Sequence, residues 1–366
     1  RGSKRMISGH GGNIYALADT HGCRPTDIID MSANVNPLGP IPEMVRYLEE
    51  NLSSLMAALP EADAGAMIRA YGQEIGVHPS HIMAGNGSTE LIHLIPRALE
   101  ARSVLIQAPT YSDYQDACTA SRIPFSLAVS RKEDNFQPDM KHLKKSAALA
   151  DLAFFCNPNN PTGVLTDRKS LIDLCRSCPK TVFVIDESYL PFVSDPEAVS
   201  LVRSHMANVL VITSMSKMFR IPGLRIGFVI GPQALIARLA HYAMPWSVNS
   251  LAQAAVNWLM THPELVRPFL YATRSQILTE KAAFIARIHA ETRIRCFSSA
   301  ASFILMHLPD SLTASGIWQA MADHRILIRN CANFSGLDER FIRVSMKNPD
   351  ENQQAAALLA ELCSQT

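Results

Sequence analysis

The chain has 366 residues, 48% of them hydrophobic and 18% charged, and its formal net charge is +1. This composition is typical of a globular protein and excludes a disordered or fibrous one, and the length allows one large and one small domain. No basic run is long enough to indicate nucleic acid, and no apolar stretch approaches the roughly 20 residues that span a bilayer. We therefore expect neither a nucleic-acid nor a membrane partner.

The first residues and the cysteines bear on the compartment. Residues Arg1–Arg5, before Met6, are typical of an expression vector and lack the pattern of a signal peptide. Among the eight cysteines only Cys175 and Cys178 have the spacing of metal ligands, and no second pair completes a site. We expect this pair on one helix beside its apolar residues, and we predict a reduced, cytoplasmic protein without a metal site.

The N-terminal part of the chain mixes loops with two helices. Residues His10–Tyr15 (HGGNIY) are Gly-rich and indicate an irregular arm, and Asp30–Pro40 is dense in Asn, Pro and Gly, which predicts a loop. Apolar residues at helical spacing then predict helices over Pro42–Leu55 and Ala64–Ile75.

From Ile82 onward, short apolar runs alternate with loops and helical stretches. The predicted strands are Ile82–Ala84, Val104–Ile106, Leu152–Cys156, Val182–Ile185, Val209–Ile212 and Ile226–Ile230. The predicted helices between them include Leu91–Leu99 and a helix from Asp167 to Cys175. Strands that alternate with helices imply a mostly parallel sheet that is covered on both faces.

The pattern changes from about Ser250 onward. Helices are predicted over Ala254–Met260, Phe269–Ile288, Gly316–Ala322 and Asn352–Cys363, and strands over Phe303–Leu308, Ile326–Arg329 and Phe341–Val344. This part is expected to form a second, smaller α+β domain. Because no Gly/Ser-rich spacer is present, we place its border within a long helix.

The ends of the predicted strands carry most of the reactive side chains, and ligands of open α/β sheets bind outside the carboxyl ends of the strands. Lys217 follows a buried strand, where loss of hydration would lower its pKa and let it attack carbonyls, although a lone lysine there also fits a solvated loop. Asp186 needs a cationic partner such as a protonated ring nitrogen, and equally fits a helix cap or an ion pair with arginine. The small residues Gly87–Thr89 open a helix, and a helix N-terminus binds phosphate.

These parts together describe pyridoxal phosphate held as a Schiff base. Three motifs carry a resemblance: NPNNPTG (Asn157–Gly163), DESY (Asp186–Tyr189) and S-x-x-K-x7-R (Ser214, Lys217 and Arg225). With them the chain resembles the fold type I pyridoxal-phosphate enzymes of the aspartate aminotransferase superfamily. This resemblance extends from His10 over essentially the whole chain.

The resemblance implies an architecture. It consists of a large α/β domain with a mostly parallel seven-stranded sheet sandwiched by helices, a smaller α+β C-terminal domain, and an N-terminal arm. The expected boundaries are 1–45 for the arm, which is part of the small domain, 46–255 for the large cofactor-binding domain, and 256–366 for the small domain. A homodimer is expected as well.

The resemblance also implies roles for single residues. Lys217 binds the cofactor aldehyde, Asp186 pairs with the pyridine N–H, and Tyr111 stacks on the ring, and these three form the expected catalytic set. Asn160 and Tyr189 would hydrogen-bond the phenolic oxygen of the ring. The expected phosphate ligands are Gly87, Ser88, Thr89, Ser214 and Arg225.

Within the superfamily, the chain resembles the branch that contains the histidinol-phosphate aminotransferases and the threonine-phosphate decarboxylases of the cobalamin pathway. The stretches HGGN (His10–Asn13), DMSANVNPLG (Asp30–Gly39) and ILIRNCANFSGL (Ile326–Leu337) favour the decarboxylases. A phosphorylated amino acid needs several donors. The candidates are His10, Asn34, Asn160, Arg329 and Arg343, of which Arg343 matches the arginine that binds the substrate carboxylate.

The resulting hypothesis is decarboxylation of a phosphorylated hydroxy-amino acid, most of all L-threonine O-3-phosphate. Transamination of histidinol phosphate, decarboxylation of L-serine O-phosphate and a regulatory domain without turnover are the alternatives. One departure concerns Leu59-Pro60-Glu61, where relatives usually carry a tyrosine that reaches across the dimer to the cofactor phosphate. Leu59 has no hydroxyl group for that contact, so either another residue replaces it or cofactor affinity is lower, and a looser pocket would also change substrate choice.

Overall fold

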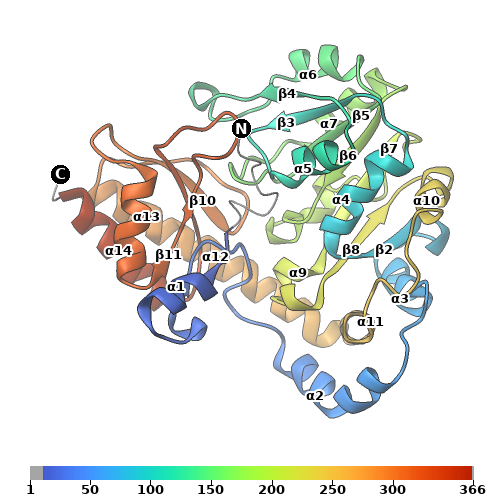
Figure 1. Cartoon of the computed structure of the whole chain (residues 1–366), viewed down its shortest axis with the longest axis horizontal. Helices are drawn as coiled ribbons and strands as arrows, with labels where there is room; N and C mark the ends of the chain where they lie inside the picture. Colours follow the sequence, from blue (N-terminus) through green and yellow to red (C-terminus); the bar gives the residue numbers. More distant parts are fainter. Residues whose placement is uncertain (1–10, 365–366) are drawn as a thin grey trace.

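A seven-stranded sheet organises the larger part of the chain in the computed structural model, which describes residues 11–364 (Figure 1). Its strands are β2 (Ile82–Asn86), β3 (Val104–Ala108), β4 (Phe125–Val129), β5 (Leu152–Cys156), β6 (Val182–Asp186), β7 (Val209–Ser214) and β8 (Ile226–Ile230). Their order is β2-β8-β7-β6-β5-β3-β4, and β8 alone runs in the opposite direction to the other strands. The carboxyl ends of the parallel strands therefore meet at one edge.

Helices cover both faces of this sheet because its central strands are apolar on both sides. Helices α4 (Gly87–Ala98), α5 (Asp113–Ala120) and α10 (Gln233–Ala240) contribute to the core on one face. Helices α6 (Met140–Ala147) and α7 (Arg168–Ser177) contribute to the core on the other. Successive residues of one strand serve opposite faces, as with Val104 and Leu105, which lie in different cores.

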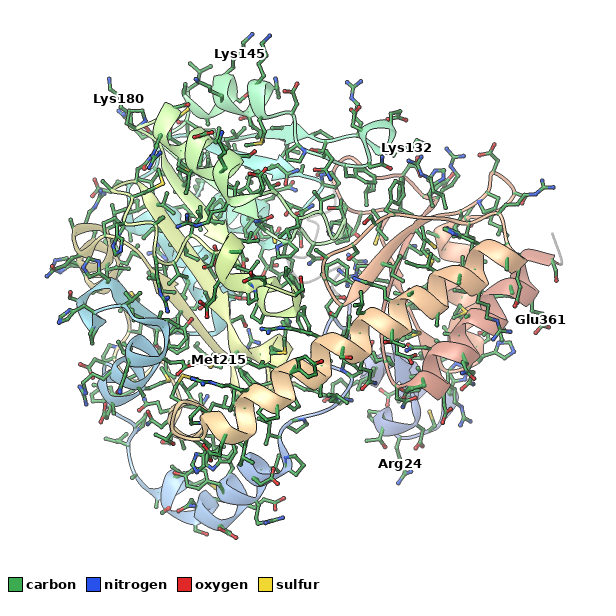
Figure 2. All side chains as sticks on the ribbon, turned by 180° about the vertical axis from the view of Figure 1, so that it is seen from behind. Arg24, Lys132, Lys145, Lys180, Met215 and Glu361 are labelled. Carbon is green, nitrogen blue, oxygen red and sulfur yellow. The ribbon has the colours of Figure 1, made fainter. Side chains whose placement is uncertain are left out.

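A third core connects the β2–β8 end of the sheet to four further helices. These are α2 (Pro42–Ala57), α3 (Gly65–Ile75), α11 (Ser250–Thr261) and α12 (Pro263–Glu291). Phe228 of β8 and Trp258 of α11 are buried in this core. Figure 2 shows that α12 crosses from the side of α2 to the C-terminal part of the chain, so this one helix touches both regions.

The C-terminal part contains an antiparallel sheet in the order β12-β13-β10-β9. Its strands are β9 (Arg295–Cys296), β10 (Phe303–His307), β12 (Arg329–Asn330) and β13 (Phe341–Ser345), and helices α12, α13 (Ala314–Asp323) and α14 (Pro349–Ser364) pack on it. The N-terminal segment joins this region, because β1 (Ile29–Asp30) pairs in parallel with β11 (Ile326–Leu327). Helix α1 (Ile14–His21) packs beside that pair.

The predicted fold class is confirmed, with several local errors. The arm is not irregular throughout, since α1 begins at Ile14 after an Asn13 cap. Helix α4 begins at Gly87, four residues before its predicted start, and Lys217 lies in the short helix α9 (Met215–Met218) where a loop was expected. The strand predicted over 326–329 is split into β11 and β12. The domain boundaries at 45 and 255 stay predictions.

The described residues form neither a membrane-spanning helix nor a metal-binding cluster. Within residues 11–364, no helix is long and apolar enough to cross a bilayer. The same residues contain no group of three His, Cys, Asp or Glu side chains that could hold a metal ion. Cys175 is buried on α7 as expected, while Cys178 is the residue that ends this helix, and both thiols are free.

Candidate active site

A small cavity of about 100 Å³ opens where the parallel strands of the large sheet end. It is lined by Ser88, Thr89, Tyr111, Tyr114, Cys156, Asn160, Asp186, Ser188, Tyr189, Ser214, Ser216, Lys217 and Arg225. The structure thus brings together every residue predicted to bind the cofactor except Gly87, which directly precedes Ser88. Residues more than 130 positions apart meet here because their strands end at the same edge of the sheet.

Lys217 contributes an amine to this cavity from the short helix α9. Burial, together with the charges of Arg225 and Arg343, lowers the pKa of Lys217 to about 8, and the charge of Asp186 opposes this shift. A substantial fraction of the amine is therefore neutral near physiological pH, which is the form that attacks a carbonyl carbon. The loop before α2 holds α9 through a backbone hydrogen bond, since the Asn36 N–H donates to the Lys217 carbonyl oxygen at 2.9 Å.

Asp186 ends β6 and is only 4% exposed. Its Oδ2 accepts a hydrogen bond from the Tyr114 hydroxyl at 2.7 Å, and its Oδ1 accepts one from the Ser188 N–H at 2.9 Å. Burial raises the pKa of Asp186, while the hydrogen bonds from Ser188 and Tyr114 and the charge of Lys217 oppose this shift. No arginine forms an ion pair with Asp186 among the described side chains, so the carboxylate is held in place and directed at the cavity.

The start of α4 and Arg225 form a cradle with the properties of an anion site. Gly87 has φ +80°, and a Cβ there would lie 2.6 Å from Nη2 of Arg225. A side chain is equally excluded at Gly227 of β8, since an added Cβ there would lie 2.5 Å from the Ser88 nitrogen. The two glycines let Arg225 and β8 approach the N-terminus of α4, whose first residues are Gly87, Ser88 and Thr89. Such an N-terminus favours a phosphate group.

Replacing Gly87 with alanine is expected to weaken cofactor binding by roughly tenfold or more, because the methyl group would displace Arg225 and the backbone has φ +80°. Titration of the apo protein with pyridoxal 5'-phosphate measures the effect. Gly223→Ala is the control, since Gly223 lies just before Arg225 and an added Cβ there meets nothing within 4 Å. Equal affinities of the two variants would contradict the cradle.

Aromatic rings form one wall of the cavity. Tyr111 meets Tyr114 edge to face with ring centroids 5.9 Å apart, and Tyr114 stacks on Phe154 at 4.9 Å. Burial raises the pKa of both phenols, so both remain protonated. Tyr111 was predicted from the sequence, whereas Tyr114 was not. Tyr111 precedes α5 and Tyr114 lies in its first turn, so no helical spacing links the two, and the bond from Tyr114 to Asp186 spans 72 positions.

Arg343, Asn160 and Asn34 form a buried polar network beside the cavity. Nη1 of Arg343 donates to Oδ1 of Asn160, and its Nη2 donates to the Ser32 carbonyl oxygen at 2.8 Å. Its Nε is buried and has no hydrogen-bond partner among the described residues. A fork with one unused donor suits an incoming carboxylate. The amide of Asn34 instead contacts Tyr189 at 3.1 Å and Ser345.

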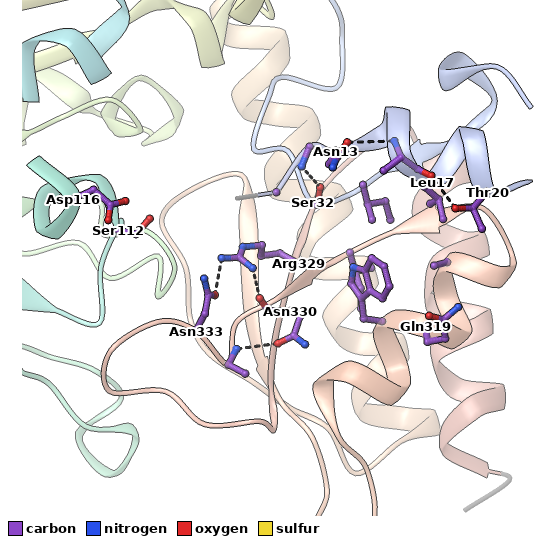
Figure 3. A pocket seen from close by; sticks show the side chains of 18 of the residues that line it. Asn13, Leu17, Thr20, Ser32, Ser112, Asp116, Gln319, Arg329, Asn330 and Asn333 are labelled. Carbon is purple, nitrogen blue, oxygen red and sulfur yellow. Dashed lines mark hydrogen bonds between the residues drawn. The ribbon is translucent and has the colours of Figure 1, made fainter. Parts of the chain in front are cut away.

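A second cavity, of about 990 Å³, lies next to Ser112 and Ser32 and extends toward α1 and α13 (Figure 3). Arg329 projects into it; its Nη2 donates to Oδ1 of Asn333 at 2.7 Å, and its guanidinium lies over the Phe334 ring at 4.9 Å. Asn13 lines the N-terminal side. The predicted ligand His10 lies outside the described residues, so the structure says nothing about its position.

The small cavity therefore contains an amine, a buried carboxylate and an anion cradle at the edge of the mostly parallel sheet, with Arg343 beside it and Arg329 in the larger cavity. The chain belongs to the class I and II aminotransferase family, which matches residues 26–359. It is an enzyme of this pyridoxal-phosphate-dependent family, and its cofactor is pyridoxal 5'-phosphate.

Individual relatives carry different names. The chain is 30% identical over 356 residues to the threonine-phosphate decarboxylase of Salmonella typhimurium, covering 96% of each chain. It is 30% identical over 348 residues to the histidinol-phosphate aminotransferase of Desulfitobacterium hafniense, covering 92% of each. It is 31% identical to the adenosylcobalamin biosynthesis bifunctional protein CobDQ of Leptospira interrogans over 94% of this chain, but spans only 40% of the length of that relative.

Solved structures agree on the fold. The L-threonine-O-3-phosphate decarboxylase of Porphyromonas gingivalis has a TM-score of 0.82 at 29% identity, over 92% of this chain and 100% of that one. The histidinol-phosphate aminotransferase of Sinorhizobium meliloti, in complex with pyridoxal-5'-phosphate, has a TM-score of 0.85 at 21% identity, over 99% of this chain and 98% of that one. The two solved structures therefore share the fold of this chain, and their names differ in the reaction.

The residues present fit the cofactor. Pyridoxal phosphate needs an amine for its aldehyde, an acid for its ring nitrogen and donors for its phosphate, and the cavity holds Lys217, Asp186 and the cradle at Gly87. The Ser188 hydroxyl adds a buried donor that has no partner among the described residues. When bound, the cofactor acts as an electron sink for bonds at the substrate α-carbon.

Proposed function

We propose that the protein decarboxylates L-threonine O-3-phosphate to (R)-1-amino-2-propanol phosphate, for the nucleotide-loop linker of a cobamide. The observation that carries the proposal is the pair of arginines at two separate places: Arg343, beside the cofactor cavity, and Arg329, in the adjoining larger cavity. A substrate with a carboxylate at one end and a phosphate at the other matches two cationic sites. The name of a relative at 30% identity, threonine-phosphate decarboxylase, supports this substrate, and the name of a relative at 31% identity supports a role in adenosylcobalamin biosynthesis.

Each residue of the site has a proposed task. Lys217 attaches the cofactor and moves a proton at the substrate α-carbon, and Asp186 pairs with the ring nitrogen. Tyr111 stacks on the ring, and Asn160 and Tyr189 donate to its phenolic oxygen. The phosphate ligands are Gly87, Ser88, Thr89, Ser214 and Arg225. The substrate ligands are His10, Asn34, Asn160, Arg329 and Arg343.

Two further features complete the proposal. All eight cysteines are free, which supports a reducing compartment such as the cytoplasm. A homodimer is supported by exposed apolar side chains near the Leu59 departure: Leu59 is 80% exposed, Met56 74%, Met244 69% and Trp246 52%. The Trp246 N–H donates to the Ala62 carbonyl oxygen at 3.0 Å, which brings the two segments together. Sedimentation as a monomer would contradict the dimer.

One experiment separates the candidate reactions. Purified protein loaded with pyridoxal phosphate is incubated with L-threonine O-3-phosphate while released CO₂ is trapped. A parallel incubation contains histidinol phosphate and 2-oxoglutarate, and a third contains L-serine O-phosphate. Stoichiometric CO₂ from threonine phosphate is the expected result. Glutamate formation without CO₂ would favour the aminotransferase, which relatives at 30% identity make the second candidate.

A further inference from the structure

Residues 32–34 accept hydrogen bonds from side chains on one side of β13 and of the residues that follow it. Arg343 donates to the Ser32 carbonyl oxygen at 2.8 Å, and Lys347 donates to the Ala33 carbonyl oxygen at 3.0 Å. Between them Ser345 contacts the side chain of Asn34. Residues 343, 345 and 347 alternate along an extended chain and so point to the same side. The strand thereby sets the position of Asn34, which is 5% exposed.

The Asn34 amide lies between two hydroxyl groups. The Ser345 hydroxyl donates to its Oδ1, and its Nδ2 donates to the Tyr189 hydroxyl oxygen at 3.1 Å. The ring of Tyr189 is fixed independently, because it meets Phe303 edge to face at 5.2 Å. Tyr189 also lines the small cavity at the end of β6. Tyr189 is therefore held by the packing of its ring and by the Asn34 amide, and neither contact uses the hydrogen of its hydroxyl group.

We propose that Asn34 is a positioning residue that directs the hydroxyl hydrogen of Tyr189 into the cofactor cavity. A phenol has one hydrogen and two acceptor lone pairs. Because Asn34 occupies one lone pair as a donor, the hydrogen of Tyr189 remains available for an acceptor in the cavity. This inference rests on the proposed contact between Tyr189 and the phenolic oxygen of the cofactor, and it is independent of whether the reaction is decarboxylation or transamination.

The electrostatics of Tyr189 agree with a donating role. Burial raises the pKa of Tyr189 to about 12, while Arg343 and the hydrogen bond from Asn34 oppose that shift. The phenol thus keeps its hydrogen at neutral pH and can donate it to an anionic oxygen. Donation to such an oxygen favours its deprotonated state. Loss of the bond should therefore move the pH midpoint of the visible band of the bound cofactor upward.

The decisive variant is Asn34→Asp, with Asn34→Ala beside it. An aspartate has almost the shape of asparagine but can only accept, so it would draw the Tyr189 hydrogen away from the cavity. We expect Asn34→Asp to weaken pyridoxal 5'-phosphate binding by about fivefold or more and to raise the midpoint of the visible band, with Asn34→Ala affected less. Equal behaviour of Asn34→Asp and the wild type would overturn the proposal.

The double variants show whether Asn34 acts through Tyr189. In the Tyr189→Phe background no phenolic hydrogen remains, so Asn34→Asp should add no further change in affinity or midpoint. An effect of the same size in that background would assign the change to the new charge and overturn the proposal. A rise in substrate KM alone, with unchanged cofactor affinity and midpoint, would also overturn it and make Asn34 a substrate ligand only.

Two controls keep the test interpretable. If Asn34→Asp does not fold, Ser345→Ala removes the donor that orients the amide, and the same upward shift of the midpoint is expected; no shift would overturn the proposal. The proposed function fails separately, by absence of CO₂ from threonine phosphate in wild-type protein. That failure leaves cofactor affinity and the visible band unchanged, so the two outcomes are distinguishable.

Discussion

Replacing Lys217 with alanine is expected to abolish both turnover and the visible absorbance of protein-bound pyridoxal phosphate. The amine lies in the cavity with Asp186 and Arg225, and among residues 11–364 no other lysine lines that cavity. Because burial lowers the pKa of Lys217 to about 8, its nucleophilic form is populated under ordinary conditions. Absorbance spectra and product assays provide the measurement. Retained turnover at any substantial rate would rule out the assigned role.

The matched control is Lys281, a second lysine whose pKa is lowered to the same value. Burial lowers the pKa of Lys281 to about 8 as well, but its amine donates to the carbonyl oxygens of Ser299 and Ala301 and lies outside the cavity. Lys281→Met should therefore keep the visible band.

In the wild type, the rate of cofactor uptake by the apo protein should rise with pH through about 8, because the amine of Lys217 is neutral above its pKa. A rate independent of pH would contradict this expectation.

Replacing Arg343 with alanine is expected to weaken substrate binding by about 2–4 kcal/mol, because the buried carboxylate of the substrate would lose its cationic partner. The loss should appear mainly as a higher KM. Arg343→Lys should recover only part of the loss, since an ammonium group lacks the planar fork that contacts Asn160 and Ser32. Steady-state kinetics with L-threonine O-3-phosphate measure both variants. The visible band reports whether the cofactor site survives, and an unchanged KM would contradict the assignment.

Arg329→Ala is the companion variant for the other end of the substrate. It lies in the larger cavity, so its loss should reduce the preference for a phosphorylated substrate and leave the visible band unchanged. Comparison of threonine phosphate with unphosphorylated threonine isolates that effect. Similar losses for both substrates would instead support a structural role, such as holding Asn333 and Phe334 in place.

The sequence was sufficient for the large sheet because its central strands are buried on both sides. Such strands are continuous apolar runs, and the strand β5 has the predicted bounds Leu152–Cys156. The edge strand β4 (Phe125–Val129) was missed, since only Ala128 in it is buried and the apolar signal is weak. The start of α4 was placed late because its first turn, with Gly87 and Ser88, has polar and flexible residues that resemble a loop.

The sequence predicted the site residues that lie in motifs at the ends of strands, but not those whose contacts join residues far apart in the chain. Lys217, Asp186 and Arg225 follow from local spacing, and the structure places all three at one cavity. The contact of Asn34 with Tyr189 joins residues 155 positions apart, and no local pattern reports it. The same applies to Tyr114, whose hydroxyl meets Asp186 across 72 positions. Such pairs are determined by the packing of whole elements.

The pairing of β1 with β11 and the contacts of β13 with residues 31–34 have a consequence for biosynthesis. During translation, the segment that holds Asn34 leaves the ribosome early but must wait for strands made some 300 residues later to secure it. The large sheet can collapse while the ribosome is still elongating, whereas the substrate side is completed only after β13 has emerged. A nascent chain stalled before that point would contain the cofactor-binding sheet without the strand that carries Arg343.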